Sequence, residues 1–114
     1  MVRTYGQQAA ADSGVPPDLL QGAQAFFSGR YQDAVTQLEA LRLPSGASSG
    51  VRLQAQLLRA AALFSTWALD REQDDRRRQA AVAAVTECRR LAPQFKPDAT
   101  VFSPRFVRFY QSVK

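Results

Sequence analysis

Apolar side chains recur every three or four residues through most of the chain, and this spacing predicts amphipathic helices. No stretch sustains the alternation of apolar and polar residues that indicates a strand. We therefore predict an all-α fold with about five helices. The first begins near residue 16 and ends before residue 28, and the others cover about 31–43, 51–70, 75–92 and 104–113.

The residues at the predicted helix ends support these bounds. Proline is well tolerated in a first helical turn, as at Pro17, and an acid such as Asp18 suits the positive end of a helix. Ser103 before Pro104 is typical of an N-cap, and either Asp74 or Asp75 is expected to cap the fourth helix. Glycine- and serine-rich segments or prolines separate most of the helices, and the charged segment 70–78 interrupts the chain between the third and the fourth.

Each predicted helix carries an apolar stripe that we expect to face a shared core. The stripe residues are Leu19, Leu20, Ala23, Phe26, Phe27, Ala34, Val35, Leu38, Ala40, Leu41, Leu53, Leu57, Ala60, Ala61, Phe64, Trp67, Ala81, Val85, Cys88, Leu91 or Ala92, Phe102, Phe106, Phe109, Tyr110 and Val113. Residues 1–15 offer little to bury, so we predict a weakly ordered lead-in. Residues 16–114 have a length that fits one domain.

The composition argues against several classes of function. The chain has no histidine and one cysteine, which excludes a serine–histidine triad, a cysteine–histidine pair and a zinc site built on several Cys or His ligands. It has no glycine-rich phosphate loop, and the acids of 70–75 lack the glycine and distal glutamate of a calcium loop. No apolar run reaches the ~18 residues of a membrane span. We expect no catalysis, no cofactor, no metal and no membrane span.

The positive charge lies in the last third of the chain. The net charge is +5, and residues 76–114 hold seven arginines and two lysines against Glu87 and Asp98. These arginines suggest an alternative function, which is the binding of an anionic polymer, either nucleic acid or an envelope polymer. However, four acids within 70–75 precede the run 76–78, and no aromatic residue interleaves it. The pattern therefore disfavours nucleic acid.

Paired helices in this sequence resemble the tetratricopeptide repeat, a helix–turn–helix of about 34 residues closed by a proline. The residues that carry the resemblance are Gly22, Gly29, Tyr31, Ala34, Leu38 and Leu41 in a first unit, and Ala60, Leu63, Phe64, Ala81, Val85, Cys88 and Pro93 in a second. The second unit departs from the family pattern by about nine extra residues at 70–78, and Trp67 and Leu69 replace the usual turn residues. The resemblance covers residues 16–93.

This resemblance implies two degenerate repeat units followed by a helix that caps the second. It also implies a groove lined by the first helix of each unit, where a partner peptide or helix would bind. The implied groove residues are Leu19, Ala23, Phe26, Phe27, Leu57, Ala61 and Phe64. Phe26 and Phe27 are adjacent and cannot both enter one core, so one of them either faces a partner or is covered by the cap or by the N-terminal segment. Arg105 and Arg108, beside the aromatic residues of the last helix, form a second candidate contact surface.

The leading functional hypothesis is therefore a non-catalytic scaffold or adaptor that binds a protein or peptide partner. A third hypothesis, after the anionic polymer, is a component of a larger assembly, such as a homodimer formed through the last helix. Cys88 occupies a small-residue core position of the repeat, so we expect a buried and inert thiol. The tail from Leu91 to Arg105 is similar to the ends of short tetratricopeptide-like domains in bacterial envelope proteins, which favours a periplasmic or envelope location over the cytoplasm.

Overall fold

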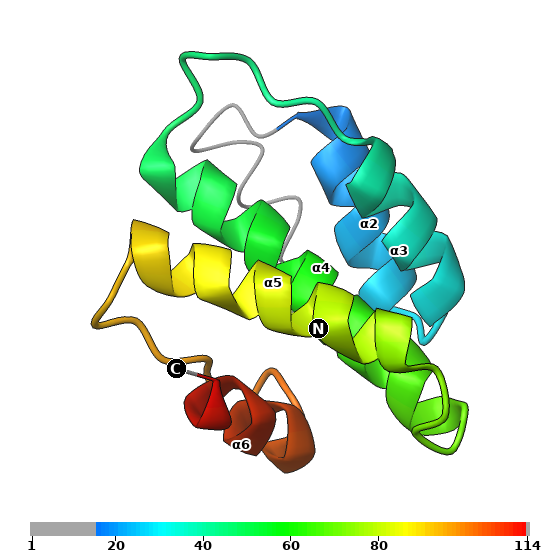
Figure 1. Ribbon diagram of the computed structural model, residues 1–114. Coiled ribbons are helices and arrows are strands. Elements are labelled where there is room, and N and C mark those ends of the chain that lie inside the picture. The colour runs from blue at the N-terminus through cyan, green and yellow to red at the C-terminus, as the bar shows by residue number, and fades with distance from the viewer. Residues whose placement is uncertain (1–15, 114) are drawn as a thin grey trace.

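A computed structural model describes residues 16–113, and this part of the chain is all-helical (Figure 1). Its helices are α2 (Pro17–Phe27), α3 (Tyr31–Ala40), α4 (Ser49–Leu69), α5 (Asp75–Leu91) and α6 (Pro104–Ser112). The predicted all-α class and five helices are confirmed for these residues. The predicted lead-in over 1–15 lies outside the described residues.

Side-chain caps fix where three of the helices begin. The Ser48 hydroxyl accepts a hydrogen bond from the Val51 amide at 3.1 Å, so α4 begins two residues before its predicted start. Asp74, rather than Asp75, caps α5, since its Oδ1 accepts from the Arg76 amide at 3.0 Å. The Ser103 hydroxyl accepts from the Phe106 amide at 3.2 Å, as expected for the N-cap of α6.

The helix α3 is shorter than predicted, because the chain leaves the helical conformation at Leu41 (φ −63°, ψ 133°). Arg42 then donates to the carbonyl of Glu39 at 3.2 Å, which satisfies one of the free carbonyls at the helix end. Ala40, predicted to face the core, is the last residue of α3 and is exposed. That prediction was wrong, because Ala40 lies on the side of α3 that faces away from the buried residues Ala34 and Leu38.

Helices α2 and α3 form one antiparallel pair and α4 and α5 form a second pair, with α6 beside the second (Figure 1). Close contact within the first pair depends on Gly22. A Cβ atom at this position would lie 2.6 Å from Cδ2 of Leu38, which is far inside van der Waals contact. Gly29 makes the turn between the two helices with a positive φ of 81°, which glycine adopts without steric cost.

The helix α4 is the centre of the core, because it packs against α2, α3, α5 and α6. Ten of its residues are buried, including the consecutive run Ala60, Ala61 and Ala62. Small side chains on several sides of one helix let its neighbours approach closely. This burial on several sides explains why the sequence pattern identified only one stripe of α4 and missed Leu58 and Ala62.

Candidate functional site

The C-terminal segment covers the surface formed by the first helix of each pair, α2 and α4. The Phe102 ring lies 5.9 Å from the Phe26 ring and 6.3 Å from the Phe27 ring of α2, measured between centroids. The rings of Phe106 and Phe109 lie 5.8 and 4.9 Å from the Phe64 ring of α4. We call the surface made by Phe26, Phe27 and Phe64 the aromatic seat. All four ring pairs are tilted, and aromatic pairs of this kind contribute energy beyond the area that they bury.

Two arginines, Arg89 on α5 and Arg105 on α6 itself, attach this segment to the rest of the domain. Arg89 of α5 donates from Nη2 to the carbonyl of Tyr110 at 2.7 Å, and its guanidinium carbon lies 5.0 Å from the Tyr110 ring centroid. Arg105 of α6 pairs with Glu72 at 2.8 Å, and its guanidinium carbon lies 5.9 Å from the centroid of the Phe64 ring. The two contacts lie at opposite ends of α6. They therefore fix its direction as well as its position.

Most of the predicted groove residues are buried beneath other parts of the domain. Buried members of the set are Leu19, Ala23, Leu57, Ala61 and Phe64. Phe26 is partly buried, and Phe27 keeps 44% of its surface exposed. The structure thus brings the aromatic members together in one seat, which α6 and Phe102 occupy. A partner therefore reaches the buried ring of Phe64 only if this segment moves.

The predicted contact residues of α6 lie on its outer side. Arg105 and Arg108 are both exposed, and Arg105 has a defined partner in Glu72. The inner side of the same helix carries Phe106 and Tyr110, which are almost completely buried. One helix therefore presents an aromatic face to the seat and a basic face to the outside.

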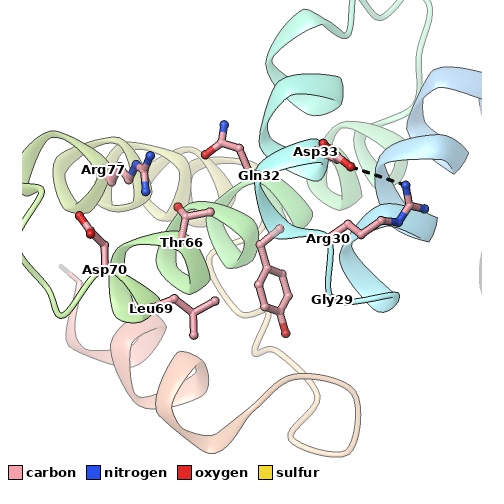
Figure 2. Close-up of a pocket in the computed structure, with 9 residues that line it drawn as sticks. Gly29, Arg30, Gln32, Asp33, Thr66, Leu69, Asp70 and Arg77 are labelled. Carbon is pink, nitrogen blue, oxygen red and sulfur yellow. Dashed lines mark ion pairs between the residues drawn. The ribbon is translucent and has the colours of Figure 1, made fainter.

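A second hollow, which sequence reasoning missed, lies where the turn between α2 and α3 meets the end of α4 and the start of α5 (Figure 2). Its volume is about 480 Å³. Thr66 lies between two walls, with Asp70 and Arg77 on one side and Arg30 and Asp33 on the other. Its lining residues are Gly29, Arg30, Tyr31, Gln32, Asp33, Thr66, Leu69, Asp70 and Arg77.

Leu69, at the edge of this hollow, exposes 73% of its surface. The only sequence signal for this feature was the departure from the repeat pattern at Leu69. The charges of the hollow are balanced locally, since Arg30 pairs with Asp33 at 3.7 Å and Arg77 pairs with Asp74 at 3.5 Å. It therefore shows no net preference for a charged ligand.

The basic residues of the last third are spread along α5 rather than gathered at one point. Arg77 and Arg90 are thirteen residues apart on this helix, which separates them by about 20 Å along the axis. Arg77 pairs with Asp74 and Arg90 pairs with Glu87. These acidic neighbours weaken the positive potential that a polymer would meet.

Within residues 16–113, no group of three or more His, Cys, Asp or Glu residues could hold a metal ion. Cys88 is fully buried, and burial is the main reason that its pKa is raised to about 12. Its thiol is consequently protonated at neutral pH and a poor nucleophile. The helices of this part of the chain include none with the length and apolar character needed to cross a membrane.

Comparisons of the chain with protein-family models, with curated proteins and with solved structures found no match. The arguments about function therefore rest on the aromatic seat, on the segment that occupies it and on the surrounding charges.

Proposed function

We propose that this domain is a non-catalytic, tetratricopeptide-like interaction module, which binds a helical segment of a partner protein on the aromatic seat. The observation that carries the proposal is the way α6 occupies the seat. Phe102 contacts Phe26 and Phe27 on α2, and Phe106 contacts Phe64 on α4. A surface that holds one aromatic helix has the shape and chemistry to hold another.

General features of protein recognition support this choice of surface. Helices commonly bind by placing an apolar face in a groove, and aromatic and arginine residues dominate the energy of interfaces. The seat supplies the aromatic residues, and Arg105 lies at its border, over the ring of Phe64. The hollow beside Leu69 has fewer aromatic contacts and balanced charges, so it is the less favoured surface.

Protein capture tests the proposal. The full chain is immobilised at physiological salt and exposed to a nuclease-treated lysate of its source cells, and the retained proteins are identified by mass spectrometry. Phe27→Asp places a charge at the edge of the seat, and Leu69→Asp places the same charge at another exposed apolar residue, outside the seat, as a matched control. We expect specific proteins that the wild type and Leu69→Asp retain and that Phe27→Asp loses, while circular dichroism shows equal helicity.

Two results would contradict the proposal. Loss of the captured proteins only in Leu69→Asp would move the interaction to the hollow of Figure 2. Retention that disappears with nuclease and falls steeply between about 50 and 200 mM salt would favour an anionic polymer as the ligand.

A further inference from the structure

We infer that α6 is an internal competitor for the aromatic seat, and that the partner is a helix with a short lead-in segment, whose aromatic residues are spaced like Phe102 in the lead-in and Phe106 and Phe109 in the helix. This inference rests on the proposed function and adds to it the chemistry of the partner and the regulation of the site. In the free protein the chain's own C-terminal segment occupies the seat, and a partner binds by replacing that segment.

The contacts of α6 indicate a separable element. It is joined to α5 by the segment 92–103, which contains Pro93 and Pro97 and has no helix. Side chains make its defined attachments, namely the ring contacts with the seat, the bond from Arg89 and the ion pair of Arg105. Such an element can leave without breaking the hydrogen bonds within any other helix.

The seat also specifies what can replace α6. Phe102 contacts two rings of α2, while Phe106 and Phe109 both contact Phe64 of α4. Phe106 and Phe109 are three residues apart on α6 and share one of its faces, whereas Phe102 precedes the N-cap Ser103 and lies outside the helix. A replacement therefore needs two aromatic residues three positions apart on a helix, and a third aromatic residue four positions before the first, in the segment that leads into the helix.

Tethering makes α6 a strong competitor of any free helix. A segment attached by a short linker acts at an effective concentration of the order of millimolar. A free peptide with the sequence of α6 must compete against that concentration, so it binds the wild-type chain poorly. Damage to the tethered copy removes the competition, whereas damage to the seat removes the binding surface itself.

The test uses two substitutions that remove the same ring contact from opposite sides. Phe106→Ala weakens the occupant and Phe64→Ala weakens the seat, and both eliminate the ring pair with centroids 5.8 Å apart. The probe is a fluorescent peptide of residues 98–114, followed by anisotropy with the full-length variants. We expect Phe106→Ala to bind the peptide at least about tenfold more tightly than the wild type, because the fraction of open seats rises. We expect no such gain for Phe64→Ala.

A milder pair of variants decides the matter if either alanine substitution reduces helicity. Arg105→Ala removes from the tethered helix the ion pair with Glu72 and the contact with Phe64, and Arg90→Ala removes an arginine whose partner is Glu87 of its own helix. The peptide keeps its own copy of Arg105, so it should bind Arg105→Ala more tightly and Arg90→Ala like the wild type. A peptide that carries alanine at the positions of Phe106 and Phe109 should bind neither variant.

Equal binding of the peptide by Phe106→Ala and Phe64→Ala would overturn the inference. If either of these variants loses helicity, equal binding by the two arginine variants would overturn it instead. If protein capture nevertheless depended on Phe27, the proposed function would stand and only the role of α6 would be wrong. Peptide exchange with no protein captured by any variant would overturn the proposed function and, with it, the partner inferred here.

Discussion

Arg89→Ala is predicted to loosen α6 without disturbing the rest of the domain. The guanidinium donates to the Tyr110 carbonyl at 2.7 Å and lies over the Tyr110 ring. A charge-assisted hydrogen bond contributes about 1.5–3 kcal/mol, and a cation–π contact adds roughly 0.5–1 kcal/mol. Against this, Arg89 Nε is buried without a hydrogen-bond partner in the described residues, and its removal offsets part of the loss. The net cost to α6 docking is about 1–2 kcal/mol.

Cys88 offers a native reporter of this loosening. Its side chain is fully buried. Cys88 directly precedes Arg89, which donates to the Tyr110 carbonyl, so the thiol lies on the part of α5 to which α6 is attached. Reaction with a thiol reagent requires the domain to open, and the rate then follows the population of the open form. A cost of about 1–2 kcal/mol corresponds to labelling that is roughly 5- to 30-fold faster.

The matched control is Arg90→Ala, because Arg90 pairs with Glu87 on the outer face of the same helix. Its labelling rate should equal that of the wild type. Equal rates for Arg89→Ala and Arg90→Ala would refute the reasoning, since they would show that the bond to Tyr110 does not hold α6 in place. A rate in Arg89→Ala that merely tracks global unfolding, measured by urea titration, would also refute it.

Three further predictions concern packing and protonation. Gly22→Ala should destabilise the domain by about 1 kcal/mol in urea unfolding, because the clash with Leu38 exceeds the gain in helix propensity; Gly50→Ala, with its nearest atom at 3.8 Å, should not destabilise it. Tyr110→Phe should leave Tm unchanged or raise it, because its buried hydroxyl has no hydrogen-bond partner in the described residues; a clear fall in Tm would contradict this. Cys88 has a native pKa of about 12 against an ordinary value near 9, so between those pH values only the unfolded chain loses the thiol proton, and stability falls as the pH rises. The urea midpoint should therefore fall more steeply with pH in the wild type than in Cys88→Ala. Equal slopes for the two proteins would contradict the raised pKa of Cys88.

Local signals made the helices predictable from the sequence. Pro17, Ser103 and Asp74 act through the first turn of their own helix, and Gly29 acts through its own φ angle. Interactions of this kind depend on a few neighbouring residues, so a reader of the sequence sees all of their determinants. The helix predicted over 31–43 ends at Ala40, and its end was missed because no strong stop signal follows this residue until Pro44.

The arrangement of the seat was less predictable, because periodicity shows that a side chain is buried but not what buries it. Phe106 was expected in the core, and nothing in its spacing indicated Phe64 as its neighbour. The bond from Arg89 to Tyr110 joins residues 21 positions apart across a proline-containing segment, whose path no local rule determines. In the sequence Arg89 was therefore one of the arginines of a candidate anion-binding surface, whereas the structure places it at the attachment of α6.

The position of α6 links the stability of this domain to binding on the aromatic seat. The contacts that bury Phe102, Phe106 and Tyr110 stabilise the free protein, and any partner that takes the seat must offset their loss. If the partner and α6 exclude each other, the two equilibria are coupled. By thermodynamic reciprocity, partner binding lowers the affinity of α6 for the seat by the same factor by which docking of α6 lowers the affinity of the partner. Partner binding should then leave α6 free while the partner covers the same rings. A partner helix can be too short to cover the part of α5 where Arg89 binds Tyr110 in the free chain. Release of α6 would then leave the region around Cys88 uncovered, and the thiol would react faster in the complex than in the free chain.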